Sequence, residues 1–187
     1  MLSKSPLLRR WGAALGAASA VLAGCGPSPV MPLPEDRLPR EAAQAFVDYA
    51  DRLSDGELRC SVIAVTHAPR AEIDINQDGR TDYAIDTRQL SCGAPPGRSS
   101  VAYFCSASAC AYPAIISRED GWEVIPLMSG NSIAAAAHYT EPRFQVRAAQ
   151  RLISGGSRIA VRDYAWRDGA LRRVDESLEM PERLAGR

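Results

Sequence analysis

The sequence predicts an α+β fold, in which one N-terminal helix precedes mainly antiparallel β hairpins bridged by disulfides. An amphipathic stretch over 41–54 comes first, and a series of short β-prone runs separated by turn residues follows it. Long helices do not alternate with strands, which argues against a parallel α/β sheet. The chain has 187 residues with 22 basic and 22 acidic side chains, which is enough for one domain of ordinary size. Because its net charge is zero, we expect no nucleic-acid partner that depends on a strong basic field.

The expected helix covers residues 41–54. Its apolar residues recur on one helical face, at Ala42, Phe46, Tyr49, Ala50 and Leu53. Glu41 lies in the first turn, and Gly56 follows as a stop signal. We expect the apolar face to pack on the core.

Most of the remaining chain is expected to be β structure. The first five runs are 60–66, 83–87, 101–104, 112–117 and 122–127. The last two flank the turn Glu119-Asp120-Gly121, which predicts a hairpin. Three further strands, at 145–153, 158–166 and 170–174, are expected to form a meander around Gly155-Gly156 and Arg167-Asp168-Gly169. The alanine-rich stretch 132–139 is expected to be a short helix or an irregular connection, and the tail after Glu179 has no clear period.

The N-terminal segment has the features of a bacterial export signal. Lys4, Arg9 and Arg10 precede an uncharged run of about 13 residues, which is too short for a permanent membrane span. The run ends in Leu22-Ala23-Gly24-Cys25, which resembles a lipobox, the processing site of bacterial lipoproteins. The resemblance implies cleavage before Cys25, diacylation of its sulfur and acylation of its new amino group. An ordinary signal peptide with a chance cysteine is the alternative.

This N-terminal segment predicts both the cellular location of the protein and its domain boundaries. Residues 1–24 are expected to be the signal peptide, 25–40 the lipidated cysteine with a tether rich in proline, and 41–187 a single globular domain. Gly26 replaces the Asp that often retains lipoproteins in the inner membrane, so the resemblance favours an outer-membrane anchor facing the periplasm. Without the signal, 19 bases (22 minus 3) face 22 acids, which gives the mature chain a net charge of −3.

Four cysteines remain in the exported domain. An even number in an oxidising compartment predicts two disulfides among Cys60, Cys92, Cys105 and Cys110. Three pairings are possible, of which we favour Cys60 with Cys92 and Cys105 with Cys110. A four-cysteine zinc site is the alternative, although the chain lacks the CxxC pairs typical of one.

One motif carries ligand chemistry. Residues 74–82 read D-x-N-x-D-G-x-x-D, so that oxygen-bearing side chains alternate along a tight turn. Such oxygens can converge on one calcium ion, and Gly79 permits the turn. The expected ligands are the side chains of Asp74, Asn76, Asp78 and Asp82 and the carbonyl of Arg80. With three charges the site would be weak, about 10⁻⁴–10⁻³ M, and would stabilise the loop instead of sensing calcium.

The motif departs from an EF-hand because its twelfth position is Ile85, not a bidentate glutamate. It is similar to the strand–loop–strand calcium sites of the FG-GAP and VCBS repeats, although a single copy is present. A looser resemblance, which adds Phe104, Cys105 and Cys110, links the chain to small uncharacterised secreted bacterial proteins. It implies a structural domain with no assigned chemistry. The alternative for the loop itself is a metal-free turn, since Asp, Asn and Gly are ordinary turn residues.

No catalytic motif is evident. The chain contains no GxSxG or HExxH pattern, and its two histidines, His67 and His138, are far apart in sequence. We therefore expect a non-enzymatic binding or structural module, anchored to the membrane through Cys25, that faces an envelope protein or peptidoglycan. The alternative function is an inhibitor or immunity-type lipoprotein that caps a periplasmic enzyme. A cell-wall hydrolase would require two acids in one cleft, which spacing alone does not show.

Overall fold

A computed structural model describes residues 37–137, 140–152 and 156–179. The predicted signal peptide, Cys25, the tether up to residue 36, His138 and the tail after Glu179 lie outside the described residues. The elements below belong to the unit Pro34–Arg187.

The first sheet consists of four antiparallel strands that pair in the order of the sequence. They are β1 (Arg70–Ile73), β2 (Asp82–Ile85), β3 (Cys110–Arg118) and β4 (Gly121–Gly130). Two short 3₁₀ helices, η1 (Thr87–Gln89) and η2 (Ser100–Tyr103), lie between β2 and β3. The predicted hairpin around Glu119-Asp120 is confirmed, because Arg118 pairs with Gly121.

The second sheet is also a four-stranded antiparallel meander. Its strands are β5 (Ser132–Ala136), β6 (Arg143–Arg151), β7 (Ser157–Arg167) and β8 (Ala170–Glu179). Its last two strands turn at Asp168 and Gly169, which both have positive φ angles, as the sequence of this turn favours. The described residues are thus mainly antiparallel strands in two sheets with few helices, which confirms the antiparallel part of the predicted fold class.

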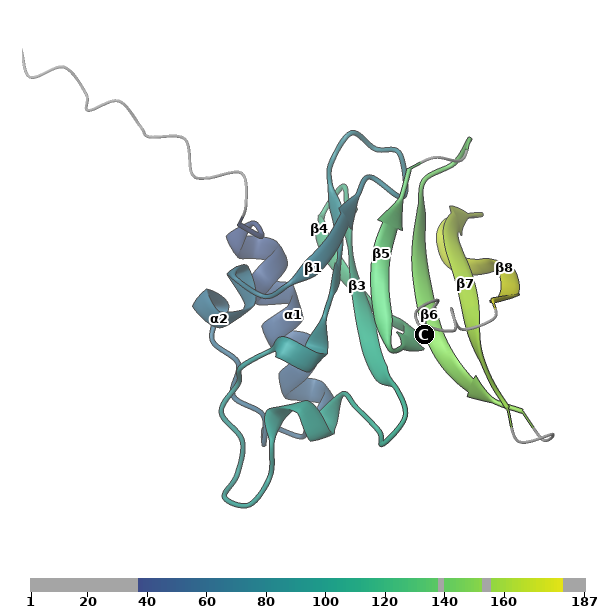
Figure 1. The fold of residues 1–187 in the computed structure, drawn as a ribbon. Helices are drawn as coiled ribbons and strands as arrows, with labels where there is room; N and C mark the ends of the chain where they lie inside the picture. The colour runs from purple at the N-terminus through teal and green to yellow at the C-terminus, as the bar shows by residue number, and fades with distance from the viewer. Residues whose placement is uncertain (1–36, 138–139, 153–155, 180–187) are drawn as a thin grey trace, which may run out of the picture. The chain divides into compact units, whose positions relative to one another are not determined.

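The first sheet is the middle layer of three (Figure 1). Ile115 of β3 packs against Phe46 of the helix α1 (Arg40–Leu53), whereas its neighbour Ile116 packs in a second core with Phe144 of β6. Successive strand residues point to opposite faces, so adjacent isoleucines serve different cores. The helix therefore covers one face of the first sheet, and the second sheet covers the other.

Helix α1 begins and ends one residue before the predicted bounds. Ala42, Phe46 and Ala50 of its predicted face are buried, whereas Leu53 is exposed. Leu38 lies within the segment predicted to be a tether, yet it is buried and its N–H donates to the carbonyl of Thr66 at 3.3 Å. The folded part of the chain therefore includes Leu38.

Three local predictions were wrong. The run 60–66 contains a five-residue helix, α2 (Val62–Thr66), because the hydroxyl of Ser61 caps it by accepting from the N–H of Ala64 at 3.1 Å. The run 101–104 belongs largely to η2, in which the hydroxyl oxygen of Ser99 accepts the N–H of Val101 at 3.3 Å. The alanine-rich stretch forms β5 over Ser132–Ala136, because Ile133 pairs with Val146 of β6 and this pairing overrides the helical propensity of alanine.

Two disulfides join Cys60 to Cys92 and Cys105 to Cys110, which is the pairing favoured from the sequence. The first bridge joins segments 32 residues apart, and the second closes a short loop before β3. Because all four sulfurs are in disulfides, the alternative of a four-cysteine zinc site is excluded for this fold.

The chain passes from the first sheet to the second through Asn131 alone. The N–H of Asn131 donates to the carbonyl of Arg147 at 2.7 Å, and its side-chain amide donates to the carbonyl of Ser108 at 2.8 Å. Gly130 precedes it, and a Cβ at that position would lie 2.4 Å from Cγ1 of Val146. The end of β4 can thus approach β6 closely only because residue 130 has no side chain.

Candidate functional site: the Asp74–Asp82 loop

The D-x-N-x-D-G-x-x-D motif forms the connection of a β hairpin. Strands β1 and β2 pair with Ile73 opposite Asp82, so residues 74–81 are the loop. Gln77 and Gly79 have positive φ angles, of 59° and 86°. These two positions give the chain its sharp curl, and glycine adopts such a conformation without strain.

The loop curls around the carboxylate of Asp74. Its Oδ1 accepts the N–H of Asp78 at 3.1 Å, and its Oδ2 accepts the N–H of Gly79 at 2.9 Å. The side-chain oxygen of Asn76 also accepts from the N–H of Asp78, at 3.2 Å, and Oδ1 of Asp78 accepts the N–H of Arg80 at 2.8 Å. Each polar side chain at positions 1, 3 and 5 of the motif therefore orders the backbone that follows it.

Asp82 has a different environment, because it is fully buried. Its Oδ2 accepts the N–H groups of Ile75 at 2.9 Å and Asn76 at 3.3 Å, and its Oδ1 accepts the N–H of Ser117 at 2.7 Å. Burial raises the pKa of Asp82, although the hydrogen bonds from Ser117 and from the loop backbone oppose this shift. Asp82 thus fastens the start of the loop to β3.

Ser117 is a central residue of the site that the sequence analysis missed. Its hydroxyl oxygen lies 2.7 Å from Oδ2 of Asp78 and 2.9 Å from Oδ1 of Asp82. A hydroxyl carries one proton, so it donates to one of these carboxylates at a time. Its carbonyl accepts from the side-chain amide of Asn76 at 2.9 Å. Ser117 lies 35 residues after Asp82, and no local pattern in the sequence marks it.

The pKa of Asp78 is lowered. Burial acts to raise it, but the hydrogen bonds from Ser117, the Arg80 backbone and Asn76, together with the charge of Arg80, outweigh burial. Asp78 is exposed, so its carboxylate faces solvent, as does the side chain of Arg80.

The acids predicted to bind calcium differ in how their oxygens are occupied. Within the described ranges, no group of three or more His, Cys, Asp or Glu side chains is arranged to hold a metal ion. Both carboxylate oxygens of Asp82 accept hydrogen bonds from buried backbone N–H groups. From the described residues Asp74 accepts two hydrogen bonds, and a carboxylate has about four lone-pair positions, so it retains acceptor capacity. Asp74, Asn76 and Asp78 therefore carry their side-chain oxygens at or near the surface of the loop, whereas Asp82 supports the loop from inside the fold.

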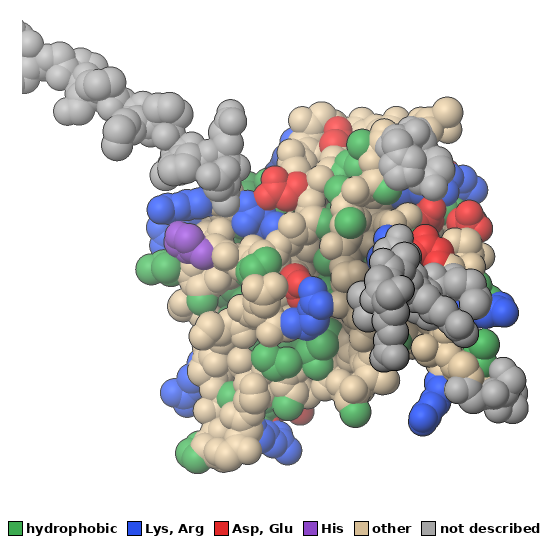
Figure 2. All heavy atoms as spheres, viewed as in Figure 1, with side chains coloured by type: hydrophobic (Ala, Val, Ile, Leu, Met, Phe, Trp, Pro, Cys, Tyr) green, Lys and Arg blue, Asp and Glu red, His purple; other side chains and the backbone are tan. Residues whose placement is uncertain are grey.

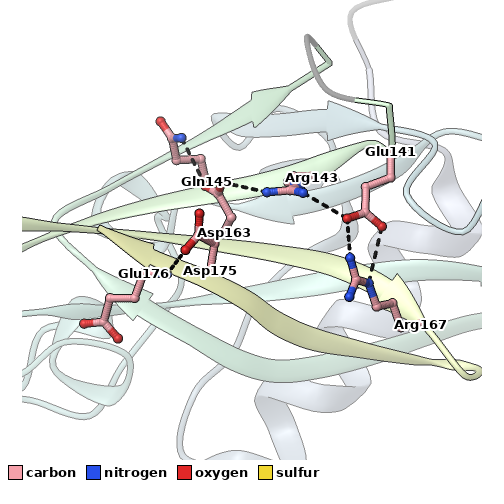
Figure 3. Close-up of polar contacts among 7 residues, drawn as sticks. All are labelled: Glu141, Arg143, Gln145, Asp163, Arg167, Asp175 and Glu176. Carbon is pink, nitrogen blue, oxygen red and sulfur yellow. Dashed lines mark hydrogen bonds and ion pairs between the residues drawn. The ribbon is translucent and has the colours of Figure 1, made fainter. Parts of the chain in front are cut away.

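A second polar cluster lies on the second sheet (Figure 3). Asp163 of β7 is buried and accepts from Arg143 at 3.2 Å and from Gln145 at 3.1 Å. Glu141 pairs with Arg143 at 2.9 Å and with Arg167 at 2.6 Å. Each buried charge in this cluster faces an opposite charge, so the arrangement is that of a structural ion-pair network.

Of the two histidines, only His67 lies within the described residues. His67 lies just after α2, and its Nδ1 is 2.8 Å from the carbonyl of Ile63. It therefore caps the end of a helix, and His138 lies outside the described residues.

Comparisons with known proteins identified no relative of this chain. The chain matches no protein-family model, and neither the search of curated proteins nor that of solved structures returned a match. None of the helices in the described part of the chain is long and apolar enough to cross a bilayer.

Proposed function

We propose that this chain is a lipid-anchored protein of the bacterial cell envelope, with a domain that is stabilised by one structural calcium ion and acts as a non-enzymatic binding or structural module. The anchor is the acylated Cys25, and residues 25–36 tether the domain to an outer membrane, facing the periplasm. The partner is another envelope protein or peptidoglycan.

The calcium part of the proposal is supported chiefly by the hydrogen bonding of the Asp74–Asp82 loop. Asp74, Asn76 and Asp78 already hold the backbone in a tight curl, so their oxygens need little further ordering to meet a cation. Hard oxygen donors on a curled loop suit calcium. Three acids within nine residues also repel one another, and a divalent ion would remove that repulsion.

The ion would have a structural role. It would join Asp74 and Asp78 across the β1–β2 connection, and Asp78 is joined to β3 through Ser117. Calcium would thus stabilise the hairpin on the first sheet. Binding to the folded state alone raises the free energy of unfolding, so calcium should stabilise the domain and a chelator should destabilise it.

The anchoring part is supported by the lipobox-like segment Leu22-Ala23-Gly24-Cys25 and by the prolines that follow it. Two or three acyl chains hold a protein stably on a bilayer, whereas one does not. The twelve residues from Cys25 to Asp36 include four prolines, which favour an extended spacer.

The anchor is tested by expression of the full chain in a bacterium with two membranes. We expect the wild type to incorporate labelled palmitate and to fractionate with the outer membrane. Cys25→Ser should abolish the label and release the protein from the membrane fraction. Gly26→Asp is the matched variant, which should keep the label but shift the protein toward the inner membrane. Unlabelled wild-type protein in the soluble fraction would contradict the anchor.

A further inference from the structure

A trench runs along helix α1 beside strand β4. Three neighbouring hollows, of about 550, 490 and 340 Å³, all have Trp122 in their walls. On the helix side they reach from Pro39 through Asp48 to Arg52, which is nearly the whole length of α1. The trench thus has the length of an extended peptide of several residues.

On the side opposite helix α1, the trench is bounded by the backbone of the edge strand β4. β4 is the end strand of the first sheet, so one side of its backbone has no neighbouring strand within that sheet. Trp122, Glu123 and Val124 all line the same hollow. Successive side chains of a strand point to opposite faces, so a hollow that contacts three consecutive residues lies alongside the backbone itself. An edge strand presents unpaired N–H and C=O groups there.

The floor and walls of the trench favour a basic occupant. Five acids line it, against three arginines: the acids are Glu41, Asp48, Glu119, Asp120 and Glu123. One of the arginines, Arg80, is held over the ring of Trp122, 4.6 Å from its centroid, and donates to the carbonyl of Arg118 at 3.0 Å. Glu123 pairs with Arg118, whereas the other four acids form no ion pair within the described part of the chain.

We propose that the trench between α1 and β4 binds an extended, positively charged peptide segment of a partner protein, which adds to the edge of β4 as a further strand. Main-chain hydrogen bonds to β4 would supply affinity, and the unpaired acids would select lysine or arginine side chains. Pro126 has no N–H and limits the added strand to the part of β4 that precedes it. The inference rests on the binding-module part of the proposed function and does not require calcium.

The test uses the isotope-labelled chain from residue 26 to 187, titrated with a capped octapeptide of alternating lysine and valine. We expect amide shifts confined to the residues around the trench, which are β4 up to Val124, the turn 119–121, residues 80–83 and the flank of α1 that carries Glu41 and Asp48. At least one amide within 122–124 should exchange more slowly with solvent when the peptide is bound, because a strand now covers that edge. The titration is run in calcium and in EDTA, so that a failure of the calcium loop is distinguished from a failure of the trench.

Two peptide controls and one pair of variants complete the test. A peptide with glutamate for lysine, and one with proline for valine, should both fail to bind. Asp48→Lys should weaken binding about tenfold or more, because like charges then meet. Asp51→Lys, on the same helix but outside the trench, should leave it unchanged. Absence of shifts at 122–124, equal binding of the proline peptide, or amides at 122–124 that are already covered by this chain's own tether would each overturn the proposal.

Discussion

At the scale of single residues, the loop depends on one buried acid and one serine. Asp82 collects three backbone N–H groups, two from the loop and one from β3. The hydroxyl of Ser117 then reaches both Asp82 and the exposed Asp78. A buried carboxylate lowers the stability of a fold unless hydrogen-bond donors surround it. Ser117 supplies such donors to Asp82, so the two residues stabilise the loop together.

Removal of the Ser117 hydroxyl should therefore destabilise the domain. Ser117→Ala leaves Asp82 with its backbone donors but removes the hydroxyl, and we expect a loss of about 1–3 kcal/mol in the free energy of unfolding. Urea unfolding measures the difference. Ser129→Ala, at an exposed position of β4, is the matched control and should change little. Equal stability of Ser117→Ala and the wild type would show that the hydroxyl does not support Asp82.

Only some of the residues in this site can be predicted from the sequence. Asp74, Asn76 and Asp78 lie at fixed spacing in one loop, and residues of these types in a turn are expected to accept hydrogen bonds from the backbone that follows them. Ser117 is brought to them by the pairing of β2 with β3, in which Tyr83 lies opposite Ile115. A contact that depends on strand register between distant segments has no local signature.

At the scale of elements, the turns were predictable, whereas the conformation of two short apolar runs, 60–66 and 101–104, was not. The hairpins at Glu119-Asp120 and at Asp168-Gly169 were predicted, because turn residues act through their own backbone conformation. The run 60–66 is rich in β-branched residues, yet most of it forms α2. Its conformation depends on the cap from Ser61 and on packing against α1, and local propensity is too weak to decide between helix and strand.

The junction between the two sheets gives an element-scale prediction. Gly130→Ala would place a methyl group 2.4 Å from Cγ1 of Val146 and 2.7 Å from the carbonyl oxygen of Arg147, so the end of β4 must move. We expect a loss of about 1–3 kcal/mol, measured by urea unfolding. Gly156→Ala is the control, because its added methyl group would meet only a side-chain atom, at 3.7 Å. If both variants unfold alike, the close approach of β4 to β6 is not needed for stability.

At the scale of the whole described domain, the hydrophobic residues are buried in two cores between three layers. The two cores on either face of the first sheet were not predictable as separate clusters, since the sequence does not say which face of a strand meets which partner. On the face drawn in Figure 2, basic and acidic side chains both occur among hydrophobic groups. The loop, the trench and the disulfides all belong to the helix and first-sheet half, so that half carries both proposed binding functions.

The most direct test of the calcium proposal is the melting temperature of the chain from residue 26 to 187, measured in EDTA and in 10 mM calcium. For a dissociation constant of about 10⁻⁴ M, calcium should add about 2.7 kcal/mol, which corresponds to a rise of about 5–10 °C. The rise should disappear in Asp78→Ala and persist in Asp120→Ala, which changes an exposed acid outside the loop. An unchanged melting temperature in the wild type, or an equal rise in Asp78→Ala, would contradict a structural calcium ion at Asp74–Asp82.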